Sequence, residues 1–212
     1  MTNAPASHDA DAATRASQVV LRDAFPRPLH TVAGFCVEVT GATTVASAVL
    51  LDAGTLTPLD RQMVAVASAD ESAPRLSALL AALAALAAPP DLALVEGHGI
   101  AHPGGFGIAS HFGVATDLPC IGVATAIDTG TARLALHEMR GAFTPLRDGP
   151  RQIGWLLRSL PDRPPLVVSP GHRVSLASAP QLVMRFVTAD RRPEPTRLAR
   201  LLLHDSPAAG DA

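Results

Sequence analysis

Residues 90–125 read PDLALVEGHGIAHPGGFGIASHFGVATDLPCIGVAT, and this stretch decides the fold. The apolar run 92–95 has the length of a strand and ends in the carboxylate of Glu96. A glycine-rich loop follows, after which residues 106–114 are expected to form a helix and residues 119–123 a second strand. This order predicts a crossover between parallel strands. It gathers polar groups at the carboxyl ends of the strands, where open α/β sheets bind ligands.

The loop after Glu96 is rich in glycine and histidine. Glycine lets the backbone approach a ligand closely because it has no Cβ atom. Two interpretations stay open: the histidines and glycines contact a ligand, or they serve only hydrogen bonding, turns and packing within the fold. The residues concerned are Gly97, His98, Gly99, His102, Gly104, Gly105 and His111.

Upstream of this stretch, the sequence predicts an antiparallel meander of strands over 31–40, 44–51 and 58–67. Leucines at helical spacing over 76–88 predict a buried amphipathic helix, which is too short to cross a bilayer. The expected fold class is therefore α/β, a three-layer fold with a five-stranded mixed sheet: the antiparallel meander, then parallel α/β units. With strand 31–40 beside strand 92–96, Cys36 and Glu38 share one face and lie next to Glu96.

The remaining segments are expected to complete a single domain over 10–204, with disordered ends at 1–9 and 205–212. A helix capped by Asp9 or Asp11 is expected to run to about residue 24. Further expected elements are listed in chain order: a connection with short strands over 129–150, strands over 151–159 and 166–169, a turn over 170–173, and helices over 176–188 and 196–203.

Composition limits the classes of partner. The chain has 212 residues, a net charge of −2 and a pI near 6.4, which is unlike a general nucleic-acid coat protein. All of its 17 basic residues are arginine, so any contact with phosphates must be local and come from arginine. Cys36 and Cys120 lie in apolar runs, and no signal pattern precedes them. We therefore expect a cytoplasmic monomer without a membrane partner.

Several motifs resemble the endonuclease V family, the deoxyinosine 3′ endonucleases, over about residues 32–202. They are VEGHGIAHP (95–103), FGIASHFGV (106–114), IGVA (121–124), IGWLLRS (153–159), SPGHRVSL (169–176) and PEPTRLA (193–199). The resemblance implies a ribonuclease-H-like fold and cleavage of a phosphodiester bond 3′ to a deaminated base, with Mg²⁺ or Mn²⁺ as cofactor. It also implies a base pocket that includes Gly97, His102, Ile108 and Gly122, and a catalytic His172.

At other positions this chain departs from the family pattern. Cys36 stands where the family has a metal-binding aspartate, and Arg75 stands where it has a glutamate. Thr125 replaces a lysine that faces the phosphate, and Gly104 and Gly105 replace two arginines. Glu96 replaces the second aspartate and keeps its charge.

These substitutions weaken a metal site. Mg²⁺ prefers hard oxygen ligands, whereas a cysteine sulfur is soft and an arginine repels the ion. The ligands still expected are Glu96, His172 and Glu38. The sequence therefore predicts a protein that recognises deoxyinosine in DNA, with RNA as an alternative, and that cleaves weakly or not at all.

Three alternatives stay open. In the first, the chain is an active Mg²⁺- or Mn²⁺-dependent DNA-repair endonuclease that uses the relocated carboxylates Glu38 and Glu71 together with Glu96 and His172. In the second, Cys36, Glu96 and His172 bind Zn²⁺. In the third, the fold is a non-catalytic scaffold for protein contacts.

Overall fold

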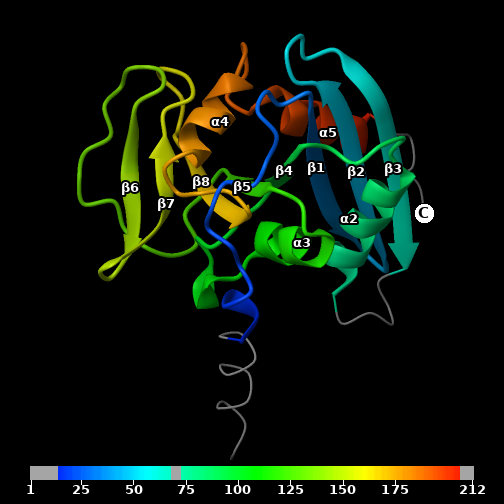
Figure 1. Cartoon of the computed structure of the whole chain (residues 1–212), viewed down its shortest axis with the longest axis horizontal. Coiled ribbons are helices and arrows are strands. Elements are labelled where there is room, and N and C mark those ends of the chain that lie inside the picture. Colours follow the sequence, from blue (N-terminus) through cyan, green and yellow to red (C-terminus); the bar gives the residue numbers. More distant parts are fainter. Residues whose placement is uncertain (1–13, 68–72, 206–212) are drawn as a thin grey trace, which may run out of the picture.

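The computed structural model describes residues 14–67 and 73–205, and in these residues one mixed sheet of eight strands forms the centre of the molecule (Figure 1). The strand order across the sheet is β3-β2-β1-β4-β5-β8-β7-β6. The strands are β1 (Thr31–Thr40), β2 (Thr43–Asp52), β3 (Pro58–Ala67), β4 (Leu92–Glu96), β5 (Cys120–Ala124), β6 (Phe143–Asp148), β7 (Arg151–Leu157) and β8 (Leu166–His172).

Strand pairing confirms the predicted meander and the neighbouring positions of β1 and β4. β1, β2 and β3 pair antiparallel, while β1, β4 and β5 run parallel. The prediction of five strands is wrong. Residues 143–172 add the antiparallel strands β6, β7 and β8, because β8 pairs with β5 and extends the sheet beyond it.

Helices cover both faces of the sheet, which confirms the α/β class and the three layers (Figure 1). α2 (Pro74–Ala85) and α3 (Ile108–Thr116) pack on one face. α4 (Ala179–Arg185) and α5 (Glu194–His204) pack on the other. Residues of β1 alternate between these faces: Phe35 packs with Phe112 of α3, at 4.8 Å between ring centroids, whereas Cys36 faces α5.

A glycine on β1 brings α5 close to the sheet. A Cβ atom at Gly34 would lie 2.0 Å from the carbonyl carbon of Pro195 and 2.5 Å from the backbone nitrogen of Thr196. Only a residue without a side chain lets the first turn of α5 rest on β1 at this distance. This close packing places the second half of α5 over the carboxyl ends of β1 and β4.

The segment before β1 differs from its prediction. The helix expected to reach residue 24 is wrong, because within the described residues only 14–16 are helical there. The segment instead bonds to the residue after β8: the Arg173 N–H donates to the Val20 carbonyl at 2.7 Å, and the Ala24 N–H donates to the Arg173 carbonyl at 3.0 Å. These long-range hydrogen bonds replace the local bonds of a helix.

The predicted turn at 170–173 is also wrong, since β8 continues through Pro170 and Gly171 to His172. Pro170 pairs with Ile121 beside a register shift, where its missing N–H is tolerated. Residues 1–9, 206–212 and Glu71 lie outside the described residues. Among the helices of the described part, none is long and apolar enough to cross a membrane.

Candidate functional site

Three polar side chains meet at the carboxyl ends of β1 and β4. Cys36, Glu38 and Glu96 all point toward α5, because side chains two residues apart in a strand share a face. The Cys36 thiol donates to Oε2 of Glu96 at 3.3 Å. The sequence thus placed these three residues together correctly.

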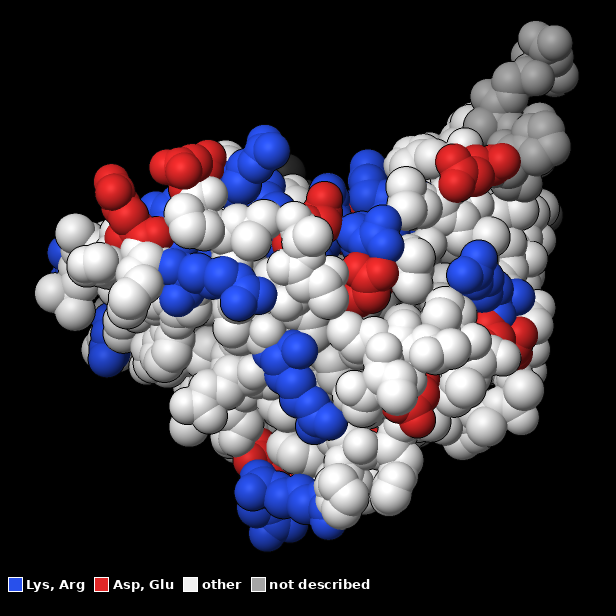
Figure 2. All heavy atoms as spheres, turned by 90° about the horizontal axis from the view of Figure 1, so that it is seen from above, with Lys and Arg blue, Asp and Glu red and all other residues white. Residues whose placement is uncertain are grey.

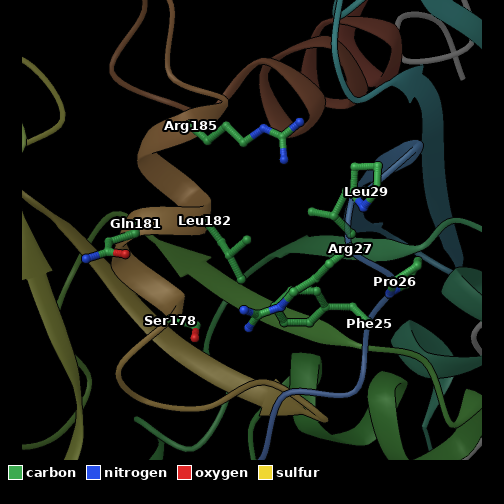
Figure 3. A pocket seen from close by; sticks show the side chains of 9 residues that line it. Phe25, Pro26, Arg27, Leu29, Ser178, Gln181, Leu182 and Arg185 are labelled. Carbon is green, nitrogen blue, oxygen red and sulfur yellow. The ribbon is translucent and has the colours of Figure 1, made fainter.

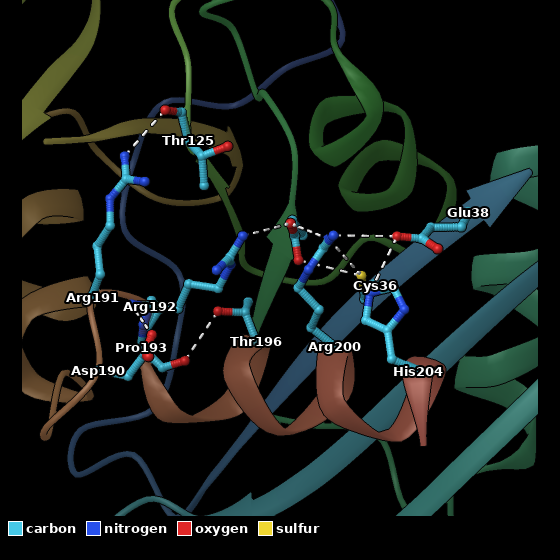
Figure 4. A network of polar contacts seen from close by, with 11 residues as sticks. Cys36, Glu38, Thr125, Asp190, Arg191, Arg192, Pro193, Thr196, Arg200 and His204 are labelled. Atoms are coloured by element: carbon cyan, nitrogen blue, oxygen red, sulfur yellow. Dashed lines mark hydrogen bonds and ion pairs between the residues drawn. The ribbon is translucent and has the colours of Figure 1, made fainter. Parts of the chain in front are cut away.

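The guanidinium of Arg200, from α5, lies between the two carboxylates (Figure 4). Its Nη1 donates to Oε1 of Glu96 at 2.7 Å, and its Nη2 lies 3.3 Å from Oε1 of Glu38. One turn further along α5, His204 Nε2 lies 3.5 Å from the same Glu38 oxygen. A permanent cation therefore occupies the space that faces both acids.

Electrostatics at this position favour the charged arginine and the neutral thiol. Partial burial alone would lower the pKa of Arg200, but attraction to Glu96 and Glu38 outweighs burial and raises it. Burial, with Glu96 adding to it, raises the pKa of Cys36 to about 12. Cys36 is therefore a protonated donor at neutral pH in this structure.

The raised pKa predicts that Cys36 is inert to alkylation. At pH 8 the thiolate, which is the reactive form, is only about one part in ten thousand of a thiol with this pKa. We expect iodoacetamide to modify no cysteine in the native protein and to modify both after unfolding, because Cys120 is buried as well and its pKa is also raised. Mass spectrometry of both samples gives the result, and rapid native labelling of Cys36 at pH 8 would contradict it.

Two further arginines, from the loop before α5, stand at the same edge of the sheet. Arg191 donates through Nη2 to the carbonyl oxygens of Thr125 at 3.1 Å and Pro165 at 2.6 Å. A guanidinium thus lies at Thr125, where the resemblance places a lysine. Arg192 Nη2 lies 3.6 Å from Oε1 of Glu96, within ion-pair distance.

His172 lies far from this group. It pairs in register with Cys120 at the amino end of β5, whereas Glu96 pairs with Val123, three residues further along. Three residues span about 10 Å of strand. His172 also faces α3, because a Cβ atom at Gly113 would lie 2.5 Å from the His172 Cβ.

The structure therefore does not bring His172 beside Glu96, as a shared catalytic or metal site would require. His172 Nε2 lies 3.2 Å from Oδ1 of Asp117, and the Val20 N–H donates to Nδ1 at 3.4 Å. These contacts connect His172 to the segment before β1 and to the residue that follows α3. The Zn²⁺ alternative needs His172 as the third ligand beside Cys36 and Glu96, and this geometry does not support it.

Within residues 14–67 and 73–205, the donor atoms at the carboxyl edge are not arranged for a divalent cation. In the residues that the structure describes, no three His, Cys, Asp or Glu side chains are arranged to hold a metal ion. Glu96 and Glu38 are already paired with Arg200, and Cys36 is protonated. An ion would have to displace a guanidinium that binds both carboxylates.

Two of the four predicted base-binding residues, His102 and Ile108, line a separate cavity of about 400 Å³ on the same sheet edge. The cavity is lined by Val39, Ala73, Pro74, Arg75, Leu76, His102, Phe106, Gly107, Ile108 and His111. Gly97, at φ +134°, leaves room for Ile108, whose Cγ2 would lie 2.6 Å from a Cβ there. Gly122 does not line it and packs on the backbone of Gly97 and Gly99. The volume is within the range of about 300–1,000 Å³ for small-ligand pockets.

Of the three loop histidines, His102 and His111 line the cavity, whereas His98 bonds within the fold. His111 stacks on Phe106 at 4.3 Å between ring centroids, and burial lowers its pKa, so it is a neutral ring on the cavity wall. His102 Nδ1 lies 2.7 Å from the Pro103 carbonyl oxygen. His98 is structural: it contacts Asp128 at 3.1 Å and the Ala126 carbonyl oxygen at 2.9 Å.

Gly104 and Gly105 both have positive φ, at +78° and +73°, in the short 3₁₀ turn η1 (Pro103–Gly105). Arg151 of β7 reaches this turn, since its Nη1 would lie 3.5 Å from a Cβ atom at Gly105. A guanidinium is therefore present beside the turn even though the turn itself carries none.

Another cavity, of about 440 Å³, lies between residues 25–29 and α4 (Figure 3). Phe25, Arg27, Leu29, Leu182 and Arg185 are among its lining residues. It borders the amino end of β1, so it is at the opposite edge of the sheet from Glu38 and Glu96. It plays no part in the site described above.

Acidic and basic side chains are interspersed over the surface seen in Figure 2. No extended surface of one charge is visible on that face, in agreement with the net charge of −2. A polyanion would therefore be attracted only locally.

The sequence missed Arg200 and Arg192. Arg200 directly follows the PEPTRLA motif, at residues 193–199, and that position was the available signal. This position alone does not predict a contact with Glu96, because an arginine on an amphipathic helix usually faces solvent.

Comparison with known proteins identifies the family. The family model for endonuclease V matches residues 13–201. Endonuclease V of Xanthomonas axonopodis pv. citri is 49% identical over 192 residues, which cover 87% of this chain and 81% of the relative. The crystal structure of Endonuclease V from Streptomyces avermitilis matches with a TM-score of 0.83 at 33% identity. The match covers 96% of this chain and 92% of the Streptomyces chain.

A more distant structure shares the fold. It is Endonuclease V of Ciona intestinalis, in complex with a 24mer DNA containing an inosine followed by a ribo-adenosine. The match has a TM-score of 0.76 at 20% identity and covers 93% of this chain and 95% of the Ciona chain. The family match and the Xanthomonas relative both span most of the sequence. The chain therefore belongs to the endonuclease V family.

Proposed function

We propose that this protein binds nucleic acid at a deaminated base, with deoxyinosine in DNA as its principal target, and that it cleaves the phosphodiester backbone weakly or not at all. One observation carries the proposal: the Arg200 guanidinium contacts Glu96 and Glu38 and faces Cys36, where a metal-dependent nuclease needs a cation with open coordination positions.

A guanidinium supplies only part of what a metal ion supplies. It neutralises the two carboxylates, but it binds no water as a Lewis acid and cannot generate hydroxide. It also stays protonated and cannot serve as a general base. Binding without hydrolysis is the chemistry that these residues support.

Base recognition is supported by the 400 Å³ cavity beside Ile108 and His102. The cavity walls are mostly apolar, with His102, His111 and Arg75 as polar groups, which suits a flipped-out base. The inosine-containing complex of the Ciona relative supports the same ligand class.

The test measures binding and cleavage of the same oligonucleotide. We expect purified protein to bind single-stranded DNA with one deoxyinosine at least about tenfold more tightly than the same DNA with deoxyadenosine. We also expect little or no nicked product in excess Mg²⁺ or Mn²⁺. Fluorescence anisotropy and denaturing gels read the two outcomes, and equal affinity for both DNAs would contradict the proposal.

The 49% identity with a protein named Endonuclease V favours a second candidate function, metal-dependent cleavage. Such cleavage requires Arg200 to leave Glu96 when substrate and Mg²⁺ or Mn²⁺ arrive. A nicked product that forms in Mg²⁺ and disappears with Glu96→Gln would establish this candidate in place of the first.

A further inference from the structure

Arg192 differs from the arginines around it. Among the described residues, its guanidinium has one partner, Glu96, at 3.6 Å, which is too long for a hydrogen bond. Its Nε is buried without a hydrogen-bond partner, as is the Nε of Arg191, and the Arg192 side chain is 28% exposed. Arg192 therefore holds unused donors at the edge of the sheet.

The neighbouring arginines have structural partners. Arg191 ties the end of β5 to the start of β8 through two carbonyl oxygens. Arg197, on α5, is held by both carboxylate oxygens of Glu194. Arg200 is held by Glu96 and Glu38. Among these four, the Arg192 guanidinium is the one that makes no hydrogen bond in the described structure.

Arg200 neutralises the negative charge at this edge of the sheet, which allows an anion to bind there. Unpaired, the Glu96 and Glu38 carboxylates would repel a phosphate group, and metal-dependent sites overcome this repulsion with a divalent cation. Here the Arg200 guanidinium cancels that charge from within the chain. Glu96 is already satisfied by Arg200 and the Cys36 thiol, so Arg192 can leave it for a stronger partner.

We propose that Arg192 binds a backbone phosphate of the nucleic acid, that Arg200 is the positioning residue which neutralises the edge, and that this binding requires no divalent metal. Guanidinium groups bind phosphates through paired, charge-assisted hydrogen bonds. Arg192 lies in the loop that leads into α5, at the carboxyl ends of β4 and β5 (Figure 4), where open α/β sheets bind their ligands. The inference rests on the proposed function.

The experiment measures the affinity of wild type, Arg192→Ala, Arg192→Lys and the matched control Arg197→Ala for inosine-containing and plain single-stranded DNA. Each titration is run with EDTA and with Mg²⁺ at equal ionic strength, over a series of salt concentrations. Thermal melting of each variant verifies that it is folded.

For Arg192→Ala we expect about tenfold weaker binding of both DNAs, because one charge-assisted contact is lost. The slope of log affinity against log salt should fall by about one. Arg192→Lys should recover part of the affinity, since it restores the charge but not the paired donors. Arg197→Ala should stay within about twofold of wild type, and wild-type affinity should be the same in EDTA as in Mg²⁺ to within about threefold.

Unchanged affinity and salt slope for Arg192→Ala would overturn the inference, and so would wild-type binding that requires Mg²⁺. Either result leaves the proposed function standing if the preference for inosine persists. Loss of that preference in wild type contradicts the proposed function instead. Even without a preference for inosine, the affinities of wild type and Arg192→Ala for plain DNA still test the phosphate contact.

Discussion

If the protein has the proposed function, the double substitution Cys36→Asp with Arg200→Ala is expected to create a Mg²⁺ site. It removes the guanidinium from between Glu96 and Glu38 and adds a third carboxylate where the protonated thiol now donates to Glu96. Three unpaired carboxylates repel one another and supply the hard oxygen ligands that Mg²⁺ prefers. Without metal, the variant should melt below the wild type.

Thermal unfolding with and without Mg²⁺ measures this effect. A ligand at a hundred times its Kd raises the free energy of unfolding by about 2.7 kcal/mol, or roughly 5–10 °C for a domain of this size. We expect such a shift in the double variant and a shift below about 1 °C in the wild type. On inosine-containing DNA, the double variant should also produce nicked product in Mg²⁺.

The matched control is Cys36→Asp with Arg197→Ala, which removes an arginine of the same helix but leaves Arg200 in place. It should show no Mg²⁺-dependent stabilisation. An equal Mg²⁺ shift in the wild type, or no shift in the double variant in saturating Mg²⁺, would contradict the proposed role of Arg200.

The substitution Gly34→Ala is expected to lower the free energy of unfolding by about 3 kcal/mol or more. The added Cβ atom would lie 2.0 Å from the Pro195 carbonyl carbon and oxygen, which are backbone atoms that cannot rotate away. α5 must therefore move off β1 and take Arg200 with it. Urea denaturation followed by circular dichroism measures the loss.

Gly54→Ala is the matched control. A Cβ atom there would meet only Oδ1 of the Asp52 side chain, at 3.3 Å, and no backbone atom, so the loss of stability should be much smaller, at about 1 kcal/mol or less. If Gly34→Ala unfolds like the wild type, α5 does not rest on β1 as closely as described. Faster alkylation of Cys36 in the Gly34→Ala variant would show directly that α5 has moved.

The sequence predicted the parts of the site that depend on local periodicity. Alternation along a strand put Cys36 and Glu38 on one face, and the crossover pattern put β4 beside β1, so their meeting with Glu96 followed. Leucine spacing likewise predicted α2, which the structure places over 74–85. These features need only the side-chain period and the order of elements.

Other features depend on contacts between distant residues. His172 was grouped with Glu96 because both lie in motifs, but β8 runs antiparallel to β5 and carries His172 to the opposite edge. Arg200 was overlooked because its role comes from the packing of α5 on Gly34, which no local pattern records. The helix expected to reach residue 24 failed for a similar reason, since hydrogen bonds with Arg173 hold that segment.

The most direct measurement is a crystal structure of the wild type grown with Mn²⁺, with anomalous scattering used to locate the ion. We expect no anomalous peak between residues 36, 38 and 96, and an intact contact between Arg200 and Glu96. An ordered Mn²⁺ ion bound by Glu96 and Glu38, with Arg200 displaced, would contradict the claim that a guanidinium has taken the cation's place.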